Sequence, residues 1–227
     1  MLVPDPLGRT WLVIPLFNEA AVIGDVVANA KAVFPHIVCV DDGSTDDSAR
    51  IAADAGAHVV HHSINLGQGA SLQTGFRFAL RDPGAQFFVT FDSDGQHQVS
   101  DAVAMVETLN ESDIDIVVGS RFLDSRTKLG VAKTATLKCA VVFERMFTRV
   151  RLTDAHNGLR ALSRHAAESM RITQNRMAHA SEIVSEIRRL RLTYAEQPVH
   201  IVYTDYSRSK GQSVWNSVNI LNDLLFK

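Results

Sequence analysis

Two aspartates separated by one residue, Asp92 and Asp94, are the residues of this 227-residue chain with the clearest capacity for chemistry. They follow an apolar run, Gln86–Phe91, and precede a glycine that permits a tight turn. Carboxylates at this spacing just past a buried strand can converge on one hard cation, with Gln96 or His97 as a third ligand. Oxygen-rich coordination suits Mg²⁺ or Mn²⁺. The motif therefore predicts a divalent metal site.

Other polar residues occur where further apolar runs end. They are Asn18 and Glu19 after residues 11–16, Asp41 and Asp42 after 36–40, Asn65 after 58–61, and Arg121 after 114–118. Each one alone is an ordinary loop residue or helix cap. Clustered like charge, however, costs stability unless a cation or a ligand offsets it. The repetition predicts a ligand site where these runs end.

The apolar runs alternate with segments of helical spacing. We expect strands over 11–16, 36–40, 58–61, 86–91 and 114–118, and helices over 20–34, 47–55, 69–81, 99–110 and 178–190. Almost wholly apolar strands separated by helices are typical of a parallel sheet covered on both faces. The predicted fold class is α/β, Rossmann-like and nucleotide-binding, with a mostly parallel sheet. Ligands of such folds gather at the carboxyl ends of the strands.

Two common phosphate-binding motifs are missing from the sequence. No Gly-x-x-x-x-Gly-Lys-Ser/Thr occurs, which excludes a P-loop NTPase. The turn at residues 17–20 has no Gly-x-Gly-x-x-Gly, which argues against a dinucleotide dehydrogenase.

Charge is distributed unevenly along the chain. The formal net charge is −2, yet residues 1–120 carry 16 acidic and 5 basic side chains, and residues 121–227 carry 9 and 18. Such asymmetry suggests one half that handles a cation and another that faces phosphates or an anionic surface. A chance distribution over solvated faces is the alternative.

Several features bear on the compartment. No apolar run approaches the ~18 residues of a membrane-spanning helix, and residues 1–10 do not resemble a secretory signal. Cys39 and Cys139 lack metal-ligand spacing, and the apolar surroundings of Cys39 favour a buried free thiol. We expect a cytoplasmic protein.

Several motifs together resemble the family 2 glycosyltransferases of the GT-A fold. They are residues 14–19 (IPLFNE), 40–46 (VDDGSTD), 65–70 (NLGQGA), 92–97 (DSDGQH), 119–121 (GSR), 154–160 (DAHNGLR), Glu182 and 208–213 (RSKGQS). Within the family, the chain is most similar to the dolichol- or polyprenyl-phosphate sugar synthases. The resemblance covers roughly residues 11–213. We therefore expect a GT-A domain over 1–213 and a C-terminal amphipathic helix over 214–227.

The resemblance implies roles for individual residues. Those that would bind the nucleotide sugar are Pro15, Phe17, Glu19, Val40, Asp42, Asn65, Gly69, Asp92 and Ser93. Asp92, Asp94 and Gln96 would hold Mg²⁺ or Mn²⁺. The acceptor phosphate would meet Arg121, Lys133, Arg160 and Ser213, and the catalytic set would be Asp94, Arg121, Arg160, Glu182 and Arg208. Gln68 stands where the family frequently has Lys, and Phe17 where it commonly has Tyr.

The expected reaction is the inverting transfer of a sugar from a UDP- or GDP-sugar to a polyprenyl phosphate such as undecaprenyl or dolichyl phosphate. A divalent ion and arginines would stabilise the leaving diphosphate. A lipid phosphate is already anionic, whereas a saccharide hydroxyl would need a carboxylate such as Glu182 to remove its proton. A family 2 enzyme with a hydroxyl acceptor is therefore one alternative. A non-catalytic scaffold that binds nucleotide sugar is another.

Two amphipathic segments suggest contact with a membrane. Residues 134–150 carry Lys138, Arg145 and Arg149 beside apolar side chains, and residues 214–227 have apolar side chains at helical spacing. Such helices can lie in a membrane interface, or they can cap the core or form a dimer face. We expect peripheral association with the inner face of the membrane, with an integral membrane partner or a homo-oligomer as candidate assemblies. Nucleic acid is not an expected partner.

Overall fold

The computed structural model describes residues 5–124, 134, 141, 145, 148–175 and 178–202. Their elements are η1 (Leu7–Arg9), β1 (Thr10–Leu16), α1 (Ile23–Lys31), β2 (His36–Asp41), α2 (Ser48–Asp54), β3 (His58–His61), α3 (Gln68–Ala79), β4 (Phe87–Thr90), α4 (Val99–Glu111), β5 (Ile116–Ser120), β6 (Arg160–Ser163), α6 (Arg164–Ser169), α7 (His179–Leu190) and β7 (Tyr194–Pro198). The helices and strands expected from the sequence are present, with ends that shift by at most three residues.

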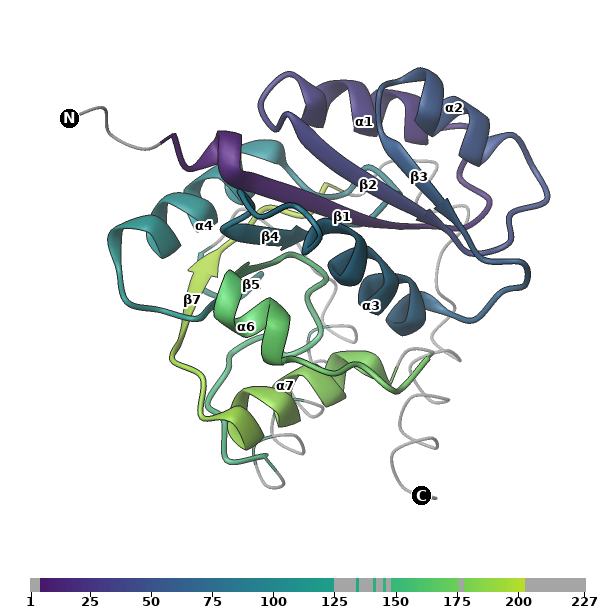
Figure 1. Ribbon diagram of the computed structural model, residues 1–227. Helices are drawn as coiled ribbons and strands as arrows, with labels where there is room; N and C mark the ends of the chain where they lie inside the picture. The colour runs from purple at the N-terminus through teal and green to yellow at the C-terminus, as the bar shows by residue number, and fades with distance from the viewer. Residues whose placement is uncertain are drawn as a thin grey trace.

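The described strands form one seven-stranded sheet in the order β3-β2-β1-β4-β6-β5-β7 (Figure 1). β1 pairs in parallel with β2 and β4, β2 with β3, and β5 with β7. β6 runs antiparallel to both β4 and β5. The prediction of a mostly parallel sheet is therefore confirmed, and its carboxyl edge carries the turns after β1, β2, β3, β4 and β5.

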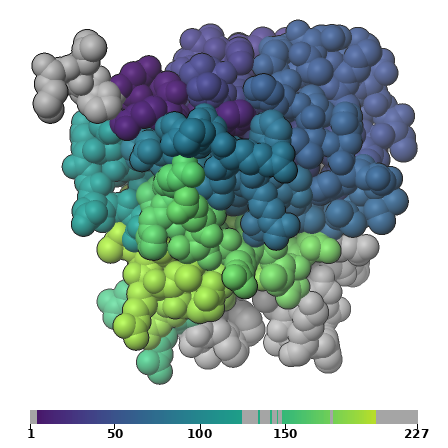
Figure 2. Space-filling view, in the orientation of Figure 1, coloured from purple at the N-terminus to yellow at the C-terminus, as the bar shows by residue number. Residues whose placement is uncertain are grey.

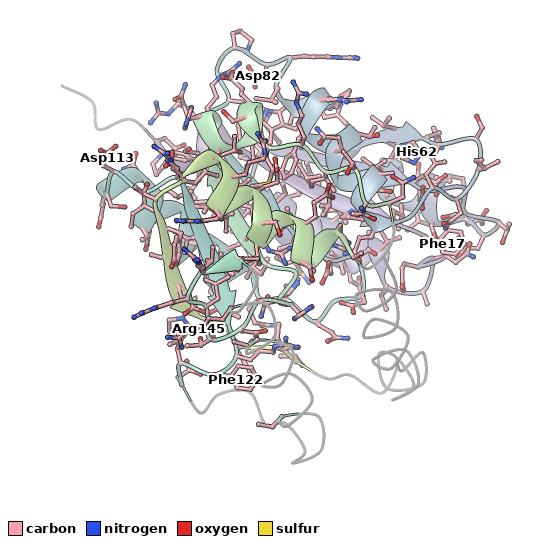
Figure 3. The ribbon with its side chains drawn as sticks, turned by 90° about the horizontal axis from the view of Figure 1, so that it is seen from below. Phe17, His62, Asp82, Asp113, Phe122 and Arg145 are labelled. Atoms are coloured by element: carbon pink, nitrogen blue, oxygen red, sulfur yellow. The ribbon has the colours of Figure 1, made fainter. Side chains whose placement is uncertain are left out.

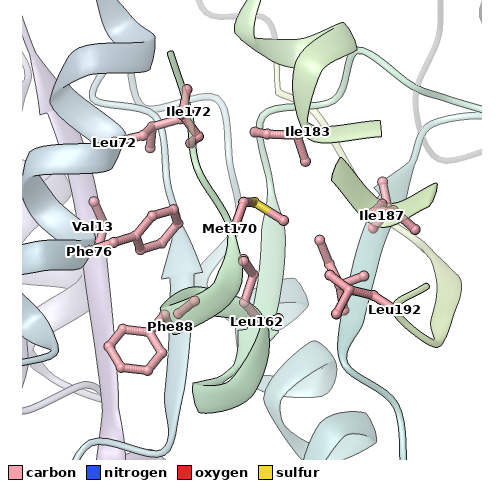
Figure 4. Close-up of a cluster of buried hydrophobic side chains, with 14 of the residues drawn as sticks. Val13, Leu72, Phe76, Phe88, Leu162, Met170, Ile172, Ile183, Ile187 and Leu192 are labelled. Atoms are coloured by element: carbon pink, nitrogen blue, oxygen red, sulfur yellow. The ribbon is translucent and has the colours of Figure 1, made fainter. Parts of the chain in front are cut away.

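Helices cover both faces of the sheet because its central strands are apolar on both sides. On one face, α1, α2 and α4 pack on a cluster that includes Leu12, Ile14 and Val89. On the other face, α3, α6 and α7 enclose a cluster that includes Phe76 and Phe88 (Figure 4). Figure 2 shows α6 and α7 together on this second face, next to α3. The result is a three-layer α/β/α arrangement that holds the carboxyl edge rigidly.

Cys39 is a free thiol buried in β2, and burial raises its pKa to about 12, which confirms the expected buried thiol. Within the described ranges, no helix is long and apolar enough to span a bilayer. Lys133, Arg208, Ser213 and the expected helix over 214–227 lie outside the described residues, as does most of 134–150.

Candidate active site

The turns after β1 and β2 are tied to each other at the carboxyl edge of the sheet. Asn18 N donates to Ser44 Oγ at 3.0 Å, and Glu19 N donates to Ser48 Oγ at 2.7 Å. Thr45 N donates in return to Asn18 Oδ1 at 2.8 Å. These bonds fix the backbone around Glu19, a residue that the resemblance assigns to the nucleotide.

Asp42 is buried at the end of β2 and organises the loop between β3 and α3. Its Oδ1 lies 2.7 Å from His62 Nδ1 and 2.9 Å from Leu66 N, and its Oδ2 lies 2.6 Å from Gly67 N. His62 Nε2 in turn lies 2.9 Å from Thr74 Oγ1. Both carboxylate oxygens of Asp42 therefore already hold the protein's own groups. From the sequence, His62 reads as an ordinary strand or loop residue, and only the fold reveals this partnership.

Asp92 lies just beyond β4 and is held in its ionised form. Its Oδ2 lies 2.9 Å from His97 Nε2, and its Oδ1 accepts a hydrogen bond from Gln68 Nε2 at 3.0 Å. Burial alone would raise the pKa of Asp92, but His97, Arg160 and His179 together hold that pKa below its usual value. These neighbours therefore favour the ionised form of Asp92 at the carboxyl edge.

Asp94 is in a different electrostatic situation. Its Oδ1 accepts a hydrogen bond from Gln96 N at 3.0 Å. Burial and the negative charge of Asp92 raise the pKa of Asp94 to about 6. A cation near both carboxylates would relieve this repulsion.

The donor set at this turn fits a divalent ion that also binds a ligand. Among the described residues, no three His, Cys, Asp or Glu side chains are arranged to hold a metal ion by themselves. Asp92 and Asp94 could instead provide two oxygen ligands, with Gln96 nearby. An ion such as Mg²⁺ would complete its shell with water and diphosphate oxygens, as this ion usually does in proteins.

β6 supports the Asp92 carboxylate from behind. Thr90 Oγ1 donates to Gly158 O at 2.6 Å and accepts from Arg160 N at 3.1 Å. A Cβ atom on Gly158 would lie 2.3 Å from Asp92 Oδ2, so only glycine leaves room for the carboxylate. Arg160 is 2% exposed and lowers the pKa of Asp92 through its charge. The 154–160 motif therefore shapes the space around Asp92.

Arg121 is anchored by a two-point ion pair at the end of β5. Its Nε and Nη2 atoms lie 2.6 and 2.7 Å from the two carboxylate oxygens of Asp154. Burial would raise the pKa of Asp154, but the bonds from Arg121 hold it below its usual value. Burial lowers the pKa of the neighbouring His156 to about 4, so this imidazole is neutral. The pairing with Asp154 fixes the orientation of Arg121.

Glu182 holds a loop against the first turn of α3. Its Oε1 accepts from Thr173 N at 3.0 Å, and its Oε2 accepts from Gln174 N at 2.8 Å. Asn175 O accepts from Gly69 N at 2.9 Å, and a Cβ on Gly69 would lie 2.0 Å from Gln174 O. The loop at residues 173–175 thus packs directly on the first turn of α3, which carries Gln68, a hydrogen-bond donor to Asp92. This geometry favours an orienting role for Glu182 over the proton removal that a hydroxyl acceptor would need.

The remaining expected site residues differ in their exposure. Phe17 is 44% exposed after β1, and Asn65 is exposed in the loop before α3, so both side chains can meet a ligand. Figure 3 shows Phe17 and His62 at the same end of the molecule. The side chain of Val40 is completely buried in the core, and the assignment of this residue to the nucleotide sugar stays a prediction. Pro15 pairs with Val40 across β1 and β2.

Comparisons with known proteins agree on one family. A model described as "Glycosyl transferase family 2" matches residues 11–171. The chain is 28% identical to a UDP-N-acetylglucosamine–dolichyl-phosphate N-acetylglucosaminyltransferase of Methanococcus voltae, over 95% of this chain and 94% of that protein. It is 26% identical to a polyprenol monophosphomannose synthase of Mycolicibacterium smegmatis, over 98% of this chain and 86% of that protein.

A solved structure shares the fold. It is glucosyl-3-phosphoglycerate synthase from Mycobacterium tuberculosis in complex with Mn²⁺, UDP and glucosyl-3-phosphoglycerate. The TM-score is 0.69 at 19% identity, and the match covers 96% of this chain and 79% of that chain.

Proposed function

Because the chain belongs to glycosyl transferase family 2, we propose that it transfers a sugar from a UDP- or GDP-sugar to a polyprenyl phosphate, with inversion and with Mg²⁺ or Mn²⁺. The observation that carries this proposal is the pair Asp92 and Asp94 at the carboxyl edge. Neighbouring charges favour the ionised form of Asp92, whereas burial and the charge of Asp92 disfavour the ionised form of Asp94. That pair suits a ligand that brings a cation with its phosphates.

The donor would lie over the turns after β1, β2 and β4, where the described polar residues converge. Phe17 offers an exposed ring on which a base can stack. Asp42 acts from beneath by holding the loop before α3 in place. When bound, the divalent ion would offset the charge that develops on the diphosphate as the sugar leaves.

The chemistry around Glu182 supports an acceptor that is already ionised. A hydroxyl acceptor must lose a proton to a base, whereas a phosphate monoester attacks as an anion. Both carboxylate oxygens of Glu182 accept main-chain hydrogen bonds, so the residue is occupied as a support. The names of two relatives that match along nearly their full length, with dolichyl-phosphate and polyprenol, point to the same acceptor class.

Positive charge to hold the acceptor phosphate would come from the second half of the chain. Arg121 is oriented by Asp154 at the carboxyl edge, and Arg160 adds its charge from beneath. Lys133, Arg208 and Ser213 complete the proposed set from outside the described residues. Because polyprenyl phosphates are membrane lipids, the enzyme would work as a peripheral protein at the cytoplasmic face of the membrane.

The direct test is transfer of radiolabelled sugar in detergent. Undecaprenyl or dolichyl phosphate would be offered with Mn²⁺ or Mg²⁺ and a panel of UDP- and GDP-sugars. We expect labelled lipid that requires the metal, that is lost in Asp94→Asn and that is retained in Asp54→Asn, a matched change at an exposed aspartate. Nucleotide binding without labelled lipid from any donor would contradict the proposal, and labelled saccharide would favour the hydroxyl acceptor.

A further inference from the structure

A cleft rich in arginine lies at the C-terminal end of α7, next to the start of β7. It has a volume of about 370 Å³ and is lined by Arg149, Arg188 and Arg191, together with Tyr194 and the buried side chains of Ile187 and Leu192. The residues come from three places in the chain: the segment before residue 150, the end of α7, and the start of β7. We call this feature the arginine cleft.

Three arginines outside the cleft are held by carboxylates, whereas the three arginines of the cleft are not held by any described carboxylate. Arg50 pairs with Asp47 and Asp54, Arg164 with Glu168, and Arg189 with Glu186. Within the described residues, by contrast, Arg149, Arg188 and Arg191 make no ion pair, and all three are exposed.

Nearby carboxylates are engaged elsewhere. Glu186 binds Arg189 and the backbone of Arg171, and Glu196 binds Thr153. Asp115 accepts hydrogen bonds from Thr193. Among the residues that the structure describes, no acid therefore neutralises the positive charge of the cleft.

Stabilisation of the α7 helix dipole accounts for only part of the cluster. Cations at a helix C-terminus interact favourably with the dipole, which explains Arg188 and Arg191. Arg149 approaches from a separate segment, and Arg151 follows it with its backbone N bonded to Tyr194 Oη at 3.0 Å. Convergence of a second basic segment on the same hollow indicates an external anion.

We propose that the arginine cleft docks the protein on a membrane by binding the phosphate of an acidic phospholipid headgroup. Arginine guanidinium groups bind phosphate oxygens in pairs. The ring of Tyr194, which is 36% exposed, suits the glycerol and the first acyl carbons next to that phosphate. A free phosphate ion would gain nothing from this ring.

The cleft lies at the amino ends of β5 and β7, whereas the proposed site lies at the carboxyl edge. Tyr194 begins β7, and β7 runs parallel to β5, whose carboxyl end carries Arg121. At about 3.3 Å per residue, the cleft lies roughly 13 Å along the strand from that end. The membrane context of this inference rests on the proposed function, but vesicle binding can be measured without donor, metal or turnover.

The test is flotation of the full chain with phosphatidylcholine vesicles that contain or lack phosphatidylglycerol. Each cation near an anionic surface favours binding about fivefold, so Arg188→Gln/Arg191→Gln is expected to weaken binding to the acidic vesicles about 25-fold. Arg50→Gln/Arg81→Gln removes the same charge elsewhere and should bind like the parent. Arg188→Lys/Arg191→Lys should retain most of the binding. Circular dichroism checks that each variant is folded.

Equal vesicle binding by the cleft variant and its charge-matched control would overturn the proposal, as would binding that does not need the acidic lipid. Inhibition of vesicle binding by millimolar inorganic phosphate alone would identify a site for a soluble anion and would also overturn it. Transfer to polyprenyl phosphate in detergent should be unchanged in the cleft variant. Loss of vesicle binding with normal transfer therefore separates this proposal from that of the catalytic function.

Discussion

Two acidic pairs lie at the carboxyl edge of the sheet, Asp41–Asp42 and Asp92–Asp94, and they differ in their hydrogen-bond partners. After β2, Asp41 accepts from Ser44 N and lies against His61, and Asp42 holds His62 and two backbone amides.

After β4, the carboxylate of Asp92 is hydrogen-bonded to His97 and Gln68. Within the described residues, Asp94 accepts a single hydrogen bond, from Gln96 N. Burial and the charge of Asp92 raise the pKa of Asp94 to about 6. Asp41 and Asp42 therefore stabilise the loops, whereas Asp92 and Asp94 carry negative charge that a bound cation can neutralise.

Gly158→Ala is expected to have the largest effect on the second pair among changes that leave both aspartates in the sequence. The new Cβ would lie 2.3 Å from Asp92 Oδ2, so the carboxylate must shift. A misplacement of about 1 Å at a catalytic site costs on the order of 10²-fold in rate, and we expect a loss of that size in kcat/KM. Steady-state kinetics measures it.

The matched control is Gly84→Ala, where the nearest atom is a side-chain oxygen of Asp82 at 3.2 Å, so activity should remain. Full activity in Gly158→Ala would show that Asp92 does not need its present position.

The first pair is disturbed most cleanly by His62→Ala. This change leaves Asp42 with two backbone donors and removes the link to Thr74, so we expect a loss of about 1–3 kcal/mol in the free energy of unfolding. Urea denaturation measures it. His61→Ala, at a side chain that is 63% exposed, should cost much less. If the two variants were equally stable, Asp42 would not be the organising residue of this loop.

Glu182→Gln sharpens the distinction between a support and a base. Glutamine keeps one acceptor oxygen for the loop at 173–174, so a support should lose less than about tenfold in kcat, with an unchanged pH profile. Loss of a general base typically costs 10²–10⁴-fold. Glu168→Gln, at an exposed partner of Arg164, is the control. A loss in the larger range would return Glu182 to the role of base and favour a hydroxyl acceptor.

The smallest expected effect is on stability against pH. Because the pKa of Asp94 is raised from 3.8 to about 6 in the folded chain, the folded state binds a proton more tightly than the unfolded state. The metal-free protein should therefore lose stability as pH rises through this window. Mn²⁺ should reduce the loss, since it favours the carboxylate. Thermal unfolding at several pH values, with and without Mn²⁺, measures the loss of stability and its reduction by the metal. Asp94→Asn should abolish both effects.

Local sequence was sufficient to predict the parts of the fold that depend on one segment at a time. The apolar strands up to β5 and the helices between them follow from periodicity. The position of Asp92 and Asp94 just after one of these strands predicts a cation site, which stays a prediction. β6 was not predicted, although it is the strand that brings Gly158 and Arg160 to Asp92. β7 was not predicted because its sequence, Tyr-Ala-Glu-Gln-Pro, lacks the apolar pattern, as an edge strand can.

Residue partnerships across the fold were beyond local reasoning. His62 meets Asp42 twenty positions away, and Arg121 meets Asp154 thirty-three positions away. The family motif marks Asp154 and Gly158 as members of one run, but only the packing of β6 on β4 explains why the run needs a glycine.

The central claim is that the Asp92–Asp94 turn takes up a divalent ion together with a nucleoside diphosphate. Its most direct measurement is electron paramagnetic resonance of Mn²⁺ titrated into the protein with UDP or GDP, for the parent, Asp94→Asn and the control Asp54→Asn. We predict that the parent and the control bind Mn²⁺ in a nucleotide-dependent manner and that Asp94→Asn does not. Equal Mn²⁺ binding by all three proteins would contradict the claim.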